Sequence, residues 1–171
     1  MKQLVLTCWS VLVLLTACDT QENRLKTPLP ELYLHFSTNG ESYYTDIKLE
    51  NGQLTYTYFQ DAENRCAQWF KSEPCWSQED LTTLSTQLSS EEQAQLSELI
   101  QNSGILQLVD DHSGENRKGQ RAYTEKLDVK LASEERHFRH HSSPNAAPKP
   151  EAFALLEKAL RDTVRKLPEQ N

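Results

Sequence analysis

Hydrophobic and polar residues alternate along residues 31–60, which is the pattern of strands that bury one face. The alternation is interrupted at Asn39 and Gly40 and again at Asn51 and Gly52, and Asn-Gly is the strongest short signal for a two-residue hairpin turn. Counting outward from the turns gives these facing pairs: Phe36 with Tyr43, Leu32 with Ile47, Leu49 with Leu54, Ile47 with Tyr56, and Thr45 with Tyr58. A shift of one residue would turn this apolar face toward water, so the two turns together predict a three-stranded antiparallel meander. The opposite face is polar and is expected to be exposed, with His35, Tyr44, Asp46, Lys48 and Glu50.

The second half of the chain predicts two helices. Ser89 and Glu92 form a capping box at the start of the first, and Gly104 supplies its stop signal. The second helix is predicted over residues 151–167 from apolar residues at helical spacing: Phe153, Leu156, Leu160, Val164 and Leu167. Pro168 ends that pattern.

Apolar and polar residues alternate with a period of two in two further segments. Residues 82–88 predict a fourth strand, although Leu81, Leu84 and Leu88 also fit one face of a helix. The stretch from Tyr123 to Leu131 predicts a strand, and a turn near residues 133–135 would pair Leu131 with Phe138 in a returning strand over residues 136–141. Residues 110–121 are polar and predict an exposed loop. The expected fold is therefore α+β, with a mostly antiparallel sheet against two helices in one domain over residues 32–167 and a tail at 168–171.

The N-terminal segment has the layout of a secretory signal. Lys2 provides a positive start, residues 4–15 are mostly apolar, and small residues precede Cys18. The apolar run is shorter than the roughly 20 residues that cross a bilayer. The sequence Leu15-Thr16-Ala17-Cys18 resembles the lipobox of bacterial prolipoproteins, in which a Leu stands three positions before an obligatory Cys.

This resemblance implies that Cys18 carries a diacylglycerol on its thiol and an acyl chain on its amine after removal of residues 1–17. Two or more acyl chains anchor a protein stably, whereas one chain binds only marginally. In the prolipoprotein class an Asp after the Cys resembles an inner-membrane retention signal, so Asp19 slightly favours the inner over the outer membrane. An ordinary secretory signal and an uncleaved N-terminal anchor are the alternatives. Residues 18–31 are polar, include Pro28 and Pro30, and are typical of a flexible tether.

The charge of the chain excludes some partners. The whole chain has 18 Lys and Arg against 25 Asp and Glu, a formal charge of −7. Removing residues 1–17 takes away only Lys2, so the mature chain carries −8. This acidic balance argues against a nucleic-acid or anionic-lipid surface. It is compatible with a protein partner in the cell envelope.

The remaining cysteines predict a disulfide. Cys8 belongs to the signal segment and Cys18 to the lipid, which leaves Cys66 and Cys75 as a pair in an oxidising compartment. A metal pair or a redox dithiol would also use two cysteines, but no Cys-x-x-Cys spacing is present. The predicted loop over residues 61–79, which contains both cysteines, also holds Trp69, Phe70 and Trp76, and these aromatics either fold back over the core or form an exposed contact patch for a partner.

Two clusters carry metal-ligating or catalytic residue types. His137, His140 and His141 are weak candidates for a zinc or copper site, because a strand would place His137 and His141 on one face and His140 on the other. Asp110, Asp111 and His112, with Ser113, Glu115 and Asn116 nearby, lack the spacing of a calcium loop or a nucleophile elbow. No catalytic residue is therefore predicted, and no cofactor beyond the lipid.

These patterns lead to a non-enzymatic envelope lipoprotein that binds a protein partner as an inhibitor, immunity or assembly factor. A metal- or small-ligand-binding lipoprotein that uses the histidine strand is the alternative, followed by a hydrolase. The sequence carries no signal for a particular oligomeric state.

Overall fold

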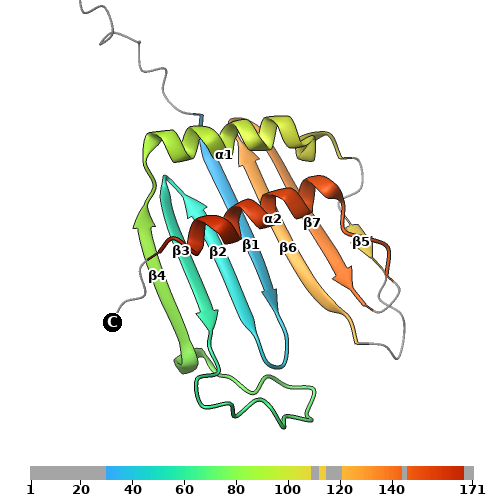
Figure 1. Cartoon of the computed structure of the whole chain (residues 1–171). Helices are drawn as coiled ribbons and strands as arrows, with labels where there is room; N and C mark the ends of the chain where they lie inside the picture. The colour runs from blue at the N-terminus through green and yellow to red at the C-terminus, as the bar shows by residue number, and fades with distance from the viewer. Residues whose placement is uncertain (1–29, 109–111, 115–120, 144–145, 168–171) are drawn as a thin grey trace, which may run out of the picture.

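A computed structural model describes residues 30–108, 112–114, 121–143 and 146–167 of the chain. Seven strands form one sheet: β1 (Leu32–Asn39), β2 (Tyr44–Glu50), β3 (Gln53–Phe59), β4 (Leu81–Gln87), β5 (His112–Gly114), β6 (Tyr123–Leu131) and β7 (Glu134–Ser142). Their order is β4-β3-β2-β1-β6-β7-β5, and every neighbouring pair is antiparallel except the parallel pair of β5 and β7. The helices α1 (Ser90–Ser103) and α2 (Glu151–Val164) lie across one face of the sheet (Figure 1). The predicted α+β fold with two helices on a mostly antiparallel sheet is confirmed.

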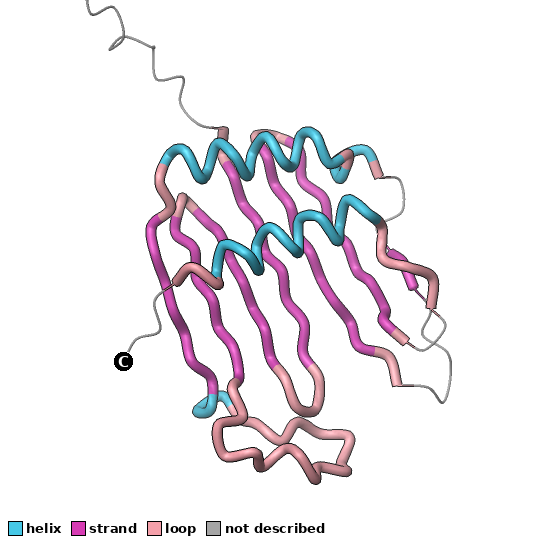
Figure 2. Tube along the Cα trace, viewed as in Figure 1, coloured by secondary structure: helices cyan, strands magenta, loops and turns pink. Residues whose placement is uncertain are grey.

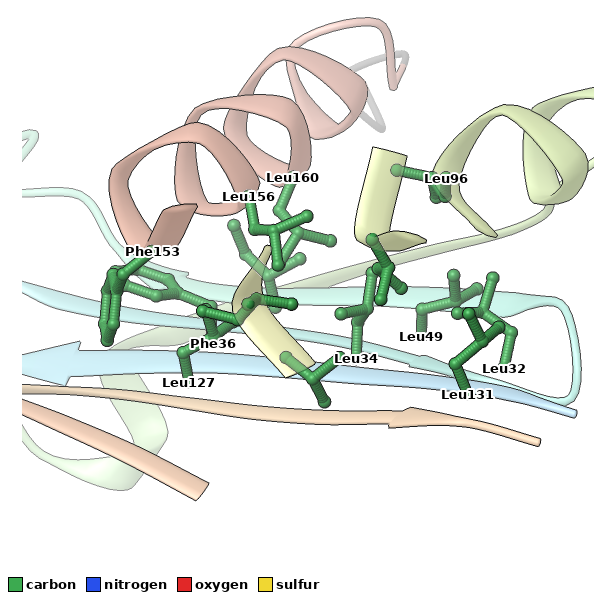
Figure 3. Close-up of a cluster of buried hydrophobic side chains, with 14 of the residues drawn as sticks. Leu32, Leu34, Phe36, Leu49, Leu96, Leu127, Leu131, Phe153, Leu156 and Leu160 are labelled. Carbon is green, nitrogen blue, oxygen red and sulfur yellow. The ribbon is translucent and has the colours of Figure 1, made fainter. Parts of the chain in front are cut away.

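The core lies between the sheet and the two helices. Alternate residues of the central strands point toward the helices and are almost fully buried, among them Leu34, Phe36, Ile47, Leu49, Leu54, Leu127 and Val129. The predicted stripe of α2 meets them, and Figure 3 shows Phe153, Leu156 and Leu160 directed at the strands. Burial of each such side chain contributes about 1.5–3 kcal/mol. The other face of the sheet, here called the open face, is covered by no described helix or strand (Figure 2).

Both ends of α1 form where the sequence predicts them, whereas α2 begins at the predicted Glu151 but ends at Val164, three residues before its predicted end. The Ser89 side chain accepts a hydrogen bond from the Glu92 N–H, and the Glu92 carboxylate accepts one from the Ser89 N–H, which completes the capping box of α1. Gly104 ends α1 with a φ of 76°, a conformation that glycine adopts without the steric cost of a Cβ. Local sequence is therefore sufficient to set both ends of this helix.

The pairing of β1 with β2 differs from the predicted register by four residues. Phe36 lies opposite Ile47 rather than Tyr43. In the predicted register Leu49 would face Pro30, outside β1, whereas in the structure Leu49 lies within the ladder and is fully buried. Because the shift is an even number of residues, the same face still points toward the helices.

The two Asn-Gly turns behave differently, which explains this error. Asn51 and Gly52 have φ values of 52° and 77° and form the predicted two-residue turn, so the β2–β3 register is confirmed. Asn39 and Gly40 have no positive φ, and the chain continues to Tyr43 before it returns. The Gly40 N–H donates to the Tyr43 carbonyl across this wider turn.

The hairpin of β6 and β7 is also displaced from its prediction. The turn consists of Ala132, which has a φ of 54°, and Ser133, so its centre lies two residues earlier than predicted. Leu131 therefore faces Glu134, and Phe138 faces Leu127 instead of Leu131. Phe138 keeps its predicted side of the sheet and is buried, because the pairing again shifts by an even number of residues.

The predicted exposed loop at residues 110–121 contains a short strand. Residues 112–114 form β5, parallel to β7 at one edge of the sheet. Gly114 has a φ of 79°, and a Cβ at this position would lie 2.1 Å from the carbonyl oxygen of His141. Three residues without apolar alternation give no strand signal, so only the close backbone approach to β7 creates this element.

Candidate functional site

The disulfide loop, residues 60–77, joins β3 to β4 at one end of the sheet (Figure 1). Cys66 and Cys75 are bonded as predicted, with 5.7 Å between their Cα atoms. The Asp61 carboxylate accepts hydrogen bonds from the N–H groups of Arg65 and Cys66, at 2.9 and 2.8 Å. The Arg65 side chain lies 2.6 Å from Asp80, so an ion pair also links the loop to the residue just before β4. Arg65 and the Ser77 N–H hold the pKa of the Asp80 carboxyl at about 2.

Trp76 attaches this loop to the sheet. Its indole N–H donates to the Gly40 carbonyl at 3.0 Å, and its ring lies 5.0 Å from that of Tyr44 and 6.4 Å from that of Phe59. The Cys75 N–H donates to the Glu41 carbonyl at 2.8 Å. Trp76 therefore packs on one end of the open face instead of projecting toward a partner.

The two other aromatic residues of the loop face solvent. Phe70 is 85% exposed and Trp69 is 36% exposed, and together they form what we call the aromatic tip. The Trp69 indole N–H donates to the Glu73 carbonyl at 2.6 Å, and the Lys71 ammonium lies 5.1 Å from the centroid of the Trp69 ring. The two alternatives for these aromatics thus divide by residue: Trp76 folds back, but onto the open face rather than over the core, and the aromatic tip is an exposed patch.

The three histidines of β7 do not converge. His137 is exposed on the open face, whereas His140 is buried on the opposite face with its Nδ1 2.9 Å from the Ser113 hydroxyl. His141 places its Nδ1 3.1 Å from the Thr124 hydroxyl. Burial holds the pKa of His140 below its ordinary value. Among the residues that the structure describes, no group of three or more His, Cys, Asp or Glu side chains is placed to hold a metal ion.

A row of imidazoles and carboxylates crosses the middle of the open face. His35 on β1 has Nε2 2.9 Å from Asp46 on β2 and Nδ1 3.5 Å from Asp128 on β6. The other oxygen of Asp128 lies 3.0 Å from Nδ1 of His137, whose Nε2 is 3.4 Å from Glu135. Five side chains from four adjacent strands thus alternate in chemical type. Each nitrogen of the two rings faces a carboxylate, so neither imidazole presents a free nitrogen to a substrate.

Sequence reasoning placed His35 and Asp46 on the polar face but did not find this row. Period-two alternation also puts Asp128 and His137 on the polar side of their strands. The pairing of β1 with β6 joins the His35–Asp46 part of the row to the Asp128–His137 part. In this pairing His35 faces Asp128, which is 93 positions away in the sequence. No local pattern encodes that pairing.

A shallow groove of about 430 Å³ has Asp128, Glu135 and His137 of the row on its wall, together with Tyr33, Lys48 and Lys130. Its cations already have partners: Lys48 lies 2.7 Å from Glu50, and Lys130 lies 2.6 Å from Glu31. The groove therefore offers a ligand paired charges rather than free ones.

Some predicted residues lie outside the described residues. These are Cys18 with the other lipobox residues, Asp19, Asp110, Asp111, Glu115 and Asn116, and only the backbone of His112 is described, in β5. Ser113, from the same predicted polar cluster, contacts His140 as stated above.

No protein-family model matches the sequence, and none of the curated proteins is similar to it at a significant level. Within the described part of the chain, no helix combines the length and the apolar character needed to cross a membrane.

Proposed function

We propose that this protein is a lipoprotein of the bacterial cell envelope, anchored through Cys18, that binds a protein partner by its aromatic tip. Binding, rather than catalysis, is the role that the described side chains support best. The lipid holds the domain at a membrane surface, and the tip supplies the contact.

The exposure of Phe70 carries this proposal. A phenylalanine that is 85% exposed forgoes most of the 1.5–3 kcal/mol or so that burial of its side chain would contribute. Binding a partner would recover this free energy, and aromatic residues, phenylalanine included, are enriched at protein interfaces relative to the rest of the surface.

The loop also holds the aromatic tip in place before any partner arrives. The disulfide, the Trp69 hydrogen bond to the Glu73 carbonyl and the docking of Trp76 all limit its motion. A contact group that is fixed in advance loses less conformational entropy on binding than a free one. This restraint favours a specific contact over an incidental exposed ring.

The position of the tip fits an anchored protein. Leu32, where β1 begins, lies at the end of the sheet opposite the disulfide loop (Figure 1). A tether over residues 18–31 can extend at most about 50 Å. With Cys18 in the membrane, the disulfide loop lies at the end of the domain opposite the attachment of the tether, where the aromatic tip is free to reach envelope proteins.

Affinity capture from detergent-solubilised membranes tests this function with the full lipidated chain as bait. We expect the wild-type chain to enrich an envelope protein, and Phe70→Ala to reduce that enrichment at least tenfold because the main apolar contact is lost. Leu155→Ala is the matched control, since Leu155 is an exposed apolar residue on α2, 42% exposed and outside the disulfide loop.

Both variants should keep the thermal unfolding midpoint of the wild type, because neither side chain is part of the core. Equal enrichment by wild type and Phe70→Ala would contradict a contact through the aromatic tip.

A further inference from the structure

The sheet has two edge strands, and they differ in how well they are protected against pairing with another chain. β5 closes one edge with only three residues, and β4 forms the other with seven. β4 pairs with β3 through seven consecutive residue pairs, and no other described strand pairs with it. β4 therefore presents a continuous outer edge of seven residues with no strand partner among the described residues.

The hydrogen bonding identifies which backbone groups of β4 point outward. The Leu88 N–H donates to the Gly52 carbonyl next to the start of β3. Since backbone groups alternate in direction along a strand, those of Leu84 and Thr86 face β3. The N–H and C=O groups of Thr83 and Ser85 then point away from the sheet.

β4 carries none of the features that usually protect an edge. Its sequence Leu-Thr-Thr-Leu-Ser-Thr-Gln contains no charged residue and no proline, and its unbroken pairing leaves no bulge. Natural edge strands commonly use charges, proline, bulges or short length to prevent pairing with other chains. An edge without these features is suited to accept an added strand.

We infer that β4 is a docking edge on which an extended segment of the protein partner adds an eighth strand to the sheet. This inference rests on the proposed function and deepens it. The disulfide loop leads through the single-turn helix η1 (Gln78–Asp80) directly into β4, so the aromatic tip and this edge belong to one continuous stretch of chain. A partner could engage both in one binding event.

The charges around β4 specify the chemistry of that segment. Glu79 stands just before the strand and Glu91 just after it, and both are exposed. An added strand that is uncharged in its middle and carries Lys or Arg near its ends would match this arrangement. A second copy of this chain would match it poorly, because antiparallel pairing around Leu84 would bring Glu79 of one copy toward Glu91 of the other, in a chain of net charge −7.

Two substitutions at Ser85 test the inference on the full chain purified in detergent. Ser85→Pro removes an outward N–H, and proline is tolerated at edge positions whose N–H does not pair within the sheet. Ser85→Ala removes the same hydroxyl but keeps the N–H, which makes it the matched control. The probe is a display library of random twelve-residue peptides, from which the tightest binders are synthesised and measured by calorimetry.

We expect the selected peptides to alternate β-branched and polar residues with Lys or Arg near their ends. Their affinity should fall at least tenfold for Ser85→Pro and less than twofold for Ser85→Ala, and the Thr83 and Ser85 amides should become protected from hydrogen exchange. Peptides that bind Ser85→Pro as tightly as wild type, or a library that yields no binder, would overturn the inference.

Two further outcomes separate this inference from the proposed function. If Phe70→Ala weakens capture of the partner while Ser85→Pro leaves it unchanged, the partner uses the aromatic tip alone and the strand-docking inference fails. A concentration-dependent dimer that Ser85→Pro abolishes would show that a second copy of this chain occupies the β4 edge. That result would overturn the inference that a segment of another protein binds there.

Discussion

His35 occupies the centre of the row of imidazoles and carboxylates on the open face. Its hydrogen bond to Asp46 raises its pKa most, burial opposes this change, and the charges of Asp46 and Asp128 add to the increase. The pKa of His35 therefore lies above its ordinary value of 6.5. Tyr33 and Lys48 are its other neighbours on this face, because the Tyr33 ring lies 6.4 Å away and Lys48 is its direct partner on β2.

This raised pKa predicts a pH-dependent contribution to stability. A group with a raised folded-state pKa stabilises the fold below its unfolded pKa, and this contribution is lost as the pH rises through the folded pKa. His35→Gln should therefore reduce the free energy of unfolding more at pH 5.5 than at pH 8.5, by on the order of 1 kcal/mol for such partly exposed pairs.

An NMR titration of the His35 ring protons measures the pKa directly. We expect Asp46→Asn to lower the midpoint of that titration. A wild-type midpoint at or below 6.5, or one that Asp46→Asn leaves unchanged, would argue against coupling along the row.

At the scale of the elements, a network of charges joins α2 to the sheet. Glu157 on α2 contacts Lys149 and lies 2.8 Å from Arg161, and Lys149 also lies 2.5 Å from Glu125 on β6. The Arg161 guanidinium stacks over the ring of Phe36, with 4.9 Å to its centroid. Burial raises the pKa of Glu157, but Lys149 and Arg161 outweigh burial, so the pKa falls below its ordinary value.

Glu157→Gln should destabilise the fold because it leaves two partly buried cations without their shared anion. The Glu157 side chain is only 14% exposed, and we expect a loss of roughly 1–3 kcal/mol at pH 7 by chemical denaturation. Because the pKa of Glu157 is lowered, its contribution is present above its unfolded pKa and is lost as the pH falls through the folded pKa, so the difference should shrink in acid.

Lys158→Gln is the control on the same helix. Lys158 pairs with Asp162 at the surface and is 74% exposed, so its loss should change stability by less than about 0.5 kcal/mol. Equal effects of the two substitutions would show that the charge network contributes no more than a surface pair.

For the whole molecule, anchoring and folding are expected to be separable. Every residue of the described core is Leu32 or follows it in the sequence, so none of these core residues belongs to the proposed tether. Cys18→Ala should abolish labelling by a fatty-acid analogue and leave the thermal unfolding midpoint of the domain unchanged. Labelling of both wild type and Cys18→Ala would reject Cys18 as the lipid attachment site.

Local sequence determined the parts of this fold that depend on short-range geometry. Asn51 and Gly52 can both adopt positive φ, so their turn fixed the register of β2 and β3. The Ser89 capping box and Gly104 set the ends of α1 in the same way, and helical spacing marked the buried face of α2. Each of these signals acts within a few residues, where backbone torsions and single hydrogen bonds decide the conformation.

Tertiary structure decided what depends on distant partners. The β1–β2 register followed the burial of Leu49 rather than the Asn39 and Gly40 signal, and β5 exists only because β7 lies beside it. The pairing of β1 with β6 brought His35 to Asp128, and the strand order left β4 at an edge. Strand order and register minimise the free energy of the whole core, so no short segment contains the information that selects them.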